Sequence, residues 1–406
     1  MLRPWVPYLS LFTAAFVTVL ATTPLARAFA WHIGAVDRPN KRRVNRVPIP
    51  RMGGIAIFLG IVAAFSMQYV GTMYLGWPMV LQSSPHLHLN YWYLVAAFFI
   101  IFLTGLADDK WSLSPKKKLA GTILAAVIAV SGGLVVGVIV NPFTDSLLDV
   151  GWLAYPVTVA YLVSFAHVFN LIDGLDGLSS GIACISATTM FVLAVLADRM
   201  DAASLAIAIT GSTLAFLRYN FNPASIFLGD SGALLIGFAL GTTSLLSVTR
   251  IAGLTTIIVP LVIAGIPIID TFSAIVRRKR ANVSIGQADR GHIHHRLIDE
   301  GFDQRQAVLV MYLWTTLLCM GTFVMTQVPT IPRIVIFVVL IGASAAFAAH
   351  LHLFQPVLLH HHNPVTGEDE LIGPQDPAFH AEEQRLREER GGRHFRRPQG
   401  EDPSTR

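Results

Sequence analysis

Residues 153–197 read "LAYPVTVAYLVSFAHVFNLIDGLDGLSSGIACISATTMFVLAVLA". Two apolar, uncharged runs, 153–169 and 179–197, flank a short loop that carries Asp173 and Asp176. An apolar run of about twenty residues crosses a hydrocarbon core of roughly 30 Å as a helix, so each run predicts a membrane span. Two acids between two spans require a reason, because ionisable groups near membrane depth are costly and usually face a site.

The same pattern recurs along the chain, in which 53% of the 406 residues are hydrophobic and only 14% are charged. A soluble protein carries about a quarter charged residues. The sequence therefore predicts an all-α polytopic membrane protein, with a membrane domain over residues 1–353. We count eleven apolar runs, at 5–31, 53–75, 91–107, 119–140, 153–169, 179–197, 203–217, 231–247, 254–276, 307–327 and 333–353.

The distribution of Lys and Arg predicts the orientation of these spans, since cytoplasmic loops hold the excess. Alternate loops, at 32–52, 108–118, 170–178, 218–230 and 277–306, carry 18 of these residues, against 4 on the opposite side. The N-terminus is therefore expected outside and the C-terminus inside. The net charge of +5 reflects this asymmetry and the membrane surface, and we do not interpret it as a nucleic-acid signal.

Both ends of the chain allow a second interpretation. The first thirty residues resemble a cleavable signal peptide, but their long apolar run and the basic cluster after it favour a retained helix. Residues 354–406 mix both charge signs with Gly and Pro, which predicts a disordered cytoplasmic tail. Cys184 and Cys319 lie in predicted spans, where packing is the expected role.

Acids, amides and histidines gather on the predicted cytoplasmic loops. Asp108 and Asp109 end one span and precede Lys118. Neighbouring helical residues point about a hundred degrees apart, so the two acids are expected to serve different partners. A solvated helix end with interfacial lysines is the alternative explanation for this loop.

The opening loop carries more polar groups than an ordinary turn needs. Asp173 and Asp176 share one face if the segment is helical, and Asn170 precedes them. One Asp-Gly pair marks a turn, but two such pairs with an amide favour a site. Further on, Asn220 and Phe227 precede Asp230 at a helix entrance. Asp230 either caps that helix or holds a hard cation.

The last cytoplasmic loop reads "ADRGHIHHRL" and combines acid, arginine and histidine within ten residues. Zinc is one interpretation of the histidines, but no cysteine accompanies them, and oxygen ligands suit magnesium better. Histidine and arginine beside acids fit a phosphate-rich substrate. The loops together match phosphoryl transfer, in which a metal, charge and alignment carry catalysis. The candidate residues here are Asp289, Arg290, His292, His294, His295 and Arg296.

Four stretches, in order, resemble the polyprenyl-phosphate N-acetylhexosamine-1-phosphate transferase superfamily (glycosyltransferase family 4), and within it the WecA/TagO-like enzymes. They are "DRPNKRRVNRVPIPRMGG", "DD" with "SPKKKLAG", "NLIDGLDGL" and "NFNPASIFLGDSG". "DRGHIHHRL" resembles the form in enzymes that use UDP-N-acetylglucosamine (UDP-GlcNAc), and the Pro-led triple-histidine version of the MurNAc-pentapeptide enzymes is lacking. The lead-in "ANVSIGQADR" is longer and less basic than usual, which leaves the sugar open.

The resemblance implies transfer of GlcNAc-1-phosphate from UDP-GlcNAc to undecaprenyl or decaprenyl phosphate, with release of UMP, in a bacterial inner membrane. It implies Mg²⁺ or Mn²⁺ as the cofactor and leaves a homodimer open. It implies catalytic roles for Asp108, Asp109, Asp173, Asp176 and His294, metal binding by Asp230 with Asp109, stacking on uracil by Phe227, and further substrate binding by Lys118, Asn170, Asn220, Asp289, Arg290, His292, His295 and Arg296.

Other functions fit the sequence less well. A phosphotransferase of the same superfamily for another UDP-N-acetylhexosamine is the nearest alternative. A transporter is the alternative from another class, but it would carry its acids at mid-span rather than at helix ends. The CDP-alcohol phosphotransferases have an Asp-Gly motif that continues with Ala-Arg, whereas this chain continues "DGLSSG".

Overall fold

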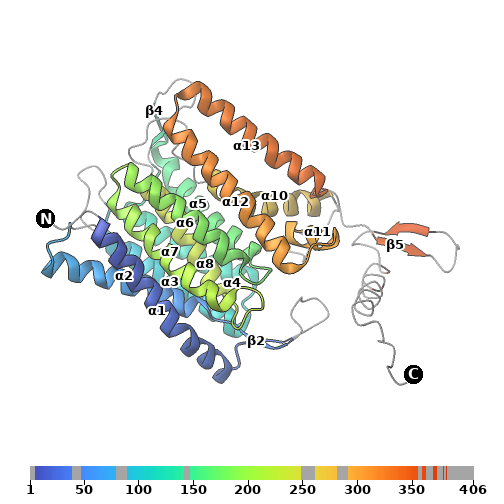
Figure 1. Ribbon diagram of the computed structural model, residues 1–406, viewed down its shortest axis with the longest axis horizontal. Helices are drawn as coiled ribbons and strands as arrows, with labels where there is room; N and C mark the ends of the chain where they lie inside the picture. The colour runs from blue at the N-terminus through green and yellow to red at the C-terminus, as the bar shows by residue number, and fades with distance from the viewer. Residues whose placement is uncertain are drawn as a thin grey trace, which may run out of the picture.

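The computed structural model is a bundle of long, roughly aligned helices (Figure 1). It describes residues 5–38, 47–78, 89–136, 138–140, 147–247, 261–280, 291–354, 359–362, 369–372, 378 and 381. The helices are α1 (Trp5–His32), α2 (Gly54–Tyr74), α3 (Tyr91–Trp111), α4 (Pro115–Ser131), α5 (Ala154–Ile172), α6 (Leu178–Leu196), α7 (Met200–Asn220), α8 (Gly229–Ser247), α10 (Gly265–Arg280), α11 (Ile293–Asp299), α12 (Gln304–Gln327) and α13 (Thr330–His350).

Helix α8 forms the centre of the bundle. Every residue from Ser231 to Leu246 is buried, and α8 packs against α2, α3, α5, α6 and α7. A helix that is apolar on all sides is expected to be buried in this way. Its glycines permit close approach, since a Cβ on Gly237 would lie 2.4 Å from the carbonyl oxygen of Phe165. The start of α8, where Asp230 stands, is therefore held from several sides.

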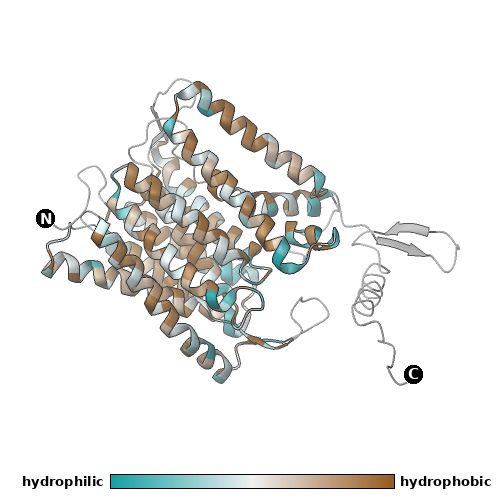
Figure 2. Cartoon of the chain, in the orientation of Figure 1, coloured by the Kyte–Doolittle hydropathy of each residue, from teal (hydrophilic) through white to brown (hydrophobic). Residues whose placement is uncertain are grey.

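The outer helices expose apolar side chains to the surroundings. Helix α13 has the highest mean hydropathy of the candidate spans, 2.2, yet only 11% of that span is buried within the protein. Apolar colour covers the flanks of the bundle in Figure 2, and polar residues gather near α11 and the start of α8. An apolar exterior with buried small and polar residues inside is the pattern of a protein surrounded by lipid.

Nine helices in the described part of the chain are long and apolar enough to cross a membrane. They match nine of the eleven predicted runs, which confirms an all-α polytopic membrane protein. The run at 119–140 becomes α4, whose 17 residues extend about 25 Å. The run at 254–276 becomes α10 from Gly265, and its first residues lie outside the described ranges. The count of eleven and the orientation stay predictions.

The termini bear on two further predictions. Helix α1, near the N-terminus, packs along α2 and α7 as part of the bundle.

The two cysteines form no disulfide. Cys184 lies in α6 and Cys319 in α12, in agreement with a packing role. In the tail, β5 (Leu359–His362) pairs with β6 (Asp369–Ile372). Most other tail residues lie outside the described ranges, so disorder there stays a prediction.

Two strand pairs and one 3-10 turn lie in the connections between the helices. Strands β1 (Val36–Asp37) and β2 (Ile49–Pro50) form an antiparallel pair between α1 and α2. Strands β3 (Val138–Val140) and β4 (Leu147–Asp149) pair between α4 and α5, followed by the single turn η1 (Gly151–Leu153). The β1–β2 pair lies beside the loop that leads into α8, because Phe227 N donates to Pro50 O at 2.9 Å.

Candidate active site

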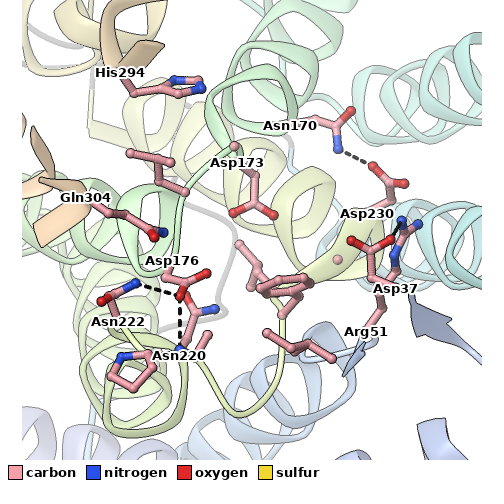
Figure 3. Close-up of a pocket in the computed structure, with 18 of the residues that line it drawn as sticks. Asp37, Arg51, Asn170, Asp173, Asp176, Asn220, Asn222, Asp230, His294 and Gln304 are labelled. Carbon is pink, nitrogen blue, oxygen red and sulfur yellow. Dashed lines mark hydrogen bonds and ion pairs between the residues drawn. The ribbon is translucent and has the colours of Figure 1, made fainter. Parts of the chain in front are cut away.

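A cavity of about 820 Å³ opens among the loops that the sequence singled out (Figure 3). Its lining comes from β1 and β2, the ends of α3 and α5, the loop before α6, the loop from α7 to α8, α11, and the start of α12. The predicted residues that line it are Asp109, Asn170, Asp173, Asp176, Asn220, Phe227, Asp230, His294 and His295. The fold thus brings most of the predicted site to one place.

Asp109 caps helix α8. Its carboxylate accepts hydrogen bonds from Asp230 N at 2.8 Å, Ser231 N at 3.1 Å and Ser231 Oγ at 2.5 Å. The first N–H groups of a helix have no partner within the helix, and an anion there also meets the positive end of the helix dipole. Gly229, at φ +73°, makes room, because a Cβ there would lie 2.6 Å from the Asp109 oxygens. Asp109 therefore positions Asp230.

Asp108 lies on the other side of Asp230. Lys118 Nζ lies 2.8 Å from Asp108 Oδ2 and 2.7 Å from Asp230 Oδ1, so one ammonium joins both acids. Neither Asp108 nor Lys118 lines the cavity. Asn170 also donates through Nδ2 to Asp230 Oδ1. Figure 3 shows this amide directed at Asp230. Asp230 therefore stands between the cavity and the Lys118–Asp108 pair.

The loop with two Asp-Gly pairs is not helical, so the condition for one shared helical face is not met. Residues 173–177 form turns between α5 and α6, and Gly177 has φ +79°. Asp176 Oδ2 accepts from Asn222 Nδ2 and Ala224 N, each at 3.0 Å, and so braces the loop after α7. In the described part of the chain no donor reaches the Asp173 carboxyl, which points into the cavity in Figure 3.

Charge surrounds Asp173. Burial raises its pKa well above the usual value, and the carboxylates of Asp230, Asp109 and Asp176 raise it further. An acid in this setting favours a proton, a cation or a cationic ligand beside it. Asp173 is therefore the cavity acid whose oxygens are available for chemistry.

Asn220 and Phe227 also line the cavity. Asn220 is buried, its Oδ1 accepts from Ser180 Oγ at 2.6 Å, and its Nδ2 donates to Ile226 O at 3.1 Å. Its amide thus holds the loop before α8. Phe227 is half-buried and lines the cavity, and its carbonyl accepts from Gly53 N at 3.0 Å.

The histidines of the last loop are fixed by an acid that the sequence analysis did not select. Asp270 is 1% exposed, and its carboxylate bonds His292 Nδ1 and Ile293 N, both at 2.7 Å. Asp270 thereby caps α11. It is the one acid within the predicted span 254–276, and that isolation is a signal that could have identified it.

His294 connects the Asp270–His292 pair to the cavity, because it contacts His292 and lines the cavity. Its ring is stacked on His292 at an interplanar angle of 7°, and it lies so close to Gly174 that a Cβ there would be 2.8 Å away. Burial, with the neighbouring His295, lowers the His294 pKa to about 3. His294 is therefore neutral at physiological pH. Arg296 is half-buried in α11, and Asp289 and Arg290 lie outside the described residues.

The residues present fit a hard cation that a substrate helps to hold. Asp173 and Asp230 offer carboxylate oxygens to one cavity. Among the described residues, no three His, Cys, Asp or Glu side chains lie close enough to hold an ion alone. Magnesium usually takes one or two carboxylates and completes its shell with water and substrate phosphates.

Comparison with known proteins supports one family. The profile of glycosyl transferase family 4 matches residues 91–248. The chain is 39% identical to the probable undecaprenyl-phosphate N-acetylglucosaminyl 1-phosphate transferase of Bacillus subtilis, over 74% of this chain and 80% of that protein. It is 35% identical to the decaprenyl-phosphate N-acetylglucosaminephosphotransferase of Mycobacterium tuberculosis, over 76% and 80%. It is 30% identical to the undecaprenyl-phosphate alpha-N-acetylglucosaminyl 1-phosphate transferase of Yersinia pestis, over 80% and 85%.

Proposed function

Because this chain belongs to glycosyl transferase family 4, we propose that it transfers GlcNAc-1-phosphate from UDP-GlcNAc to a polyprenyl phosphate. An oxygen of the lipid phosphate forms a bond to the β-phosphorus of UDP-GlcNAc. The bond from that phosphorus to the bridging oxygen breaks, and UMP leaves. The product is polyprenyl-diphospho-GlcNAc, with which the synthesis of an envelope glycan begins.

The observation that carries this proposal is the meeting of acids from three separate loops at one end of the bundle. Asp109 ends α3, Asp173 and Asp176 follow α5, and Asp230 begins α8. A cluster of carboxylates at a membrane surface suits a metal–diphosphate, because the cation offsets the charges of both.

In this proposal Asp230 and Asp173 would hold Mg²⁺ or Mn²⁺, which would offset negative charge on the diphosphate. Asp109 acts through helix α8 rather than as a ligand, since all three of its hydrogen bonds go to the start of that helix. This assignment changes the metal-binding role that the sequence resemblance implied for Asp109.

The two sides of Asp230 suit the two substrates. The cavity contains Phe227, whose ring would stack on uracil, and the neutral His294, a hydrogen-bond partner for the sugar or diphosphate. The Lys118–Asp108 pair, outside the cavity, would bind the lipid phosphate. Asp108 would accept its proton or orient it, with Lys118 balancing the charge.

Location and orientation complete the proposal. The polytopic helix bundle and the relatives support a membrane enzyme, and we propose a bacterial inner membrane with the N-terminus outside. Single cysteines near Gln287 and Asp145 should then label from opposite sides of sealed vesicles. Labelling from one side would overturn this orientation.

Release of UMP by the purified protein tests the activity. We expect UMP from UDP-GlcNAc only when polyprenyl phosphate is present, and loss of that release in Asp230→Asn. Asp299→Asn is the matched control, because Asp299 is exposed at the end of α11 and does not line the cavity. Uptake of a solute into vesicles without UMP release would instead favour a transporter.

A further inference from the structure

The cavity is strongly acidic, yet its proposed occupant carries two phosphates. Its lining includes five aspartates, at positions 37, 109, 173, 176 and 230. Among the described lining residues Arg51 is the one Lys or Arg. A single bound divalent cation leaves such a site with surplus negative charge, so a cation in the wall has a clear electrostatic use.

The backbone around Arg51 is fixed to the segment that leads to Asp230. Arg51 N donates to Ala35 O at 3.0 Å, and Gly53 N and Gly54 N donate to the carbonyls of Phe227 and Leu228 at 3.0 Å. The two glycines permit this docking, since a Cβ on Gly54 would lie 2.2 Å from Gly232 N. Arg51 thus keeps a constant position relative to the start of α8.

The side chain of Arg51 is held at one point and has donors to spare. Its Nη2 lies 2.5 Å from Asp37 Oδ1, and Asp37 is its one hydrogen-bond partner among the described residues. A guanidinium has five N–H donors in a planar fork, so most of them remain for a ligand. The side chain is 22% exposed, which leaves it accessible from the cavity. Figure 3 shows the pair at the cavity wall.

These contacts describe a phosphate-binding group. A planar fork anchored on a carboxylate is pre-organised for a second, bidentate contact with phosphate oxygens. Arg51 and Asp173 also line the same cavity.

We propose that Arg51, positioned by Asp37, binds the diphosphate of the sugar nucleotide, an inference that rests on the proposed function. The phosphate could come from the nucleotide or from the lipid. Arg51 lies in the cavity with Phe227, whereas the Lys118–Asp108 pair lies outside it, so the nucleotide is the source. Arg51 then supplies positive charge to a cavity lining that otherwise contains five aspartates.

Calorimetric titration of the purified full-length protein, with Mg²⁺ present, tests this assignment. The probes are UDP and uridine, which differ by the diphosphate. Arg51→Gln should bind UDP about 10- to 100-fold more weakly, which corresponds to the loss of a charge-assisted hydrogen bond. Uridine affinity should stay at the wild-type value, which also reports that the variant is folded. Arg51→Lys keeps the charge but loses the fork, so it should give an intermediate loss for UDP.

Arg38→Gln is the matched control. Arg38 is exposed, stands next to Asp37 in the chain, and does not line the cavity, so the same change of charge there should leave UDP binding unaltered. Asp37→Ala should weaken UDP binding in the wild-type background and have no further effect when Arg51 is Gln. A steady-state measurement of KM for polyprenyl phosphate at saturating UDP-GlcNAc should give the same value for Arg51→Lys and wild type.

Several results would overturn the assignment. Unchanged UDP affinity in Arg51→Gln, or an equal loss for uridine, removes the phosphate contact. A rise in KM for the lipid with unchanged UDP affinity moves Arg51 to the acceptor site. Each of these outcomes leaves the proposed function intact, because UMP release by the wild type is measured separately. Failure of the wild type to bind UDP removes the proposed function and this inference together.

Discussion

Replacing Asp109 by Asn separates a structural role from a chemical one at the acidic end of the bundle. The Asp109 carboxylate accepts three hydrogen bonds from the start of α8, one at Oδ1 and two at Oδ2. An asparagine has one acceptor oxygen and presents an NH₂ group in place of the other. The best placement keeps both bonds from Ser231 and turns the NH₂ group towards Asp230 N.

The expected cost follows from these contacts. A buried N–H left without an acceptor costs about 1–3 kcal/mol. Loss of the anion at the helix N-terminus adds about 0.3–1 kcal/mol. Asp109→Asn should therefore destabilise the protein by about 1–4 kcal/mol, which for a chain of 406 residues corresponds to a fall in thermal midpoint of about 2–5 °C. Turnover should fall as well, because Asp230 sits on the first turn of the loosened helix.

Asp173→Asn is the matched comparison, since it also removes one cavity carboxylate. Its carboxyl has no hydrogen-bond donor among the described residues, and burial with the neighbouring carboxylates raises its pKa, so neutralising it removes no hydrogen bond and relieves repulsion. We expect Asp173→Asn to keep or raise the midpoint and to lose turnover. Differential scanning fluorimetry in one detergent at one scan rate, with UMP release on the same samples, gives both quantities. An Asp109→Asn midpoint equal to that of the wild type would refute the capping argument.

Three further predictions concern the metal and the histidine loop. EDTA should abolish UMP release and Mg²⁺ or Mn²⁺ should restore it, while a zinc-specific chelator has little effect, because the site is rich in oxygen and lacks cysteine; full turnover after EDTA treatment would contradict this. Asp270→Asn should lower turnover by up to about 100-fold, because His292 and Ile293 N lose a charged acceptor and α11 shifts; a rate equal to that of Asp299→Asn would show that α11 needs no such anchor. Between pH 7 and 5 the His294 imidazole of the unfolded chain binds a proton, while that of the folded protein, with its pKa of about 3, stays neutral. Acid should therefore lower the thermal midpoint of the wild type more than that of His294→Gln. Parallel curves of midpoint against pH for the two proteins would disprove this.

The membrane class and the loops that form the candidate site could be read from the sequence alone. Apolar runs long enough to span a bilayer are a local property, and nine of the eleven predicted runs are such helices. The acids stood out because charge is rare within those runs and the acids lie at their ends. Their placement on loops, rather than at mid-span, already separated an interfacial enzyme from a transporter. The different partners of Asp108 and Asp109 also followed from the angle between adjacent helical residues.

The division of labour among the acids was decided by the tertiary structure. Asp109, Asp173 and Asp230 carry the same functional group, yet one caps a helix, one has no donor among the described residues, and one bonds Lys118 and Asn170. Those partners come from residues up to 122 positions away, and no local pattern encodes them. The Asp270–His292 pair, 22 positions apart, arises in the same way. The role of a carboxylate depends on the donors and charges that packing brings to it, because a buried polar group without a partner is costly.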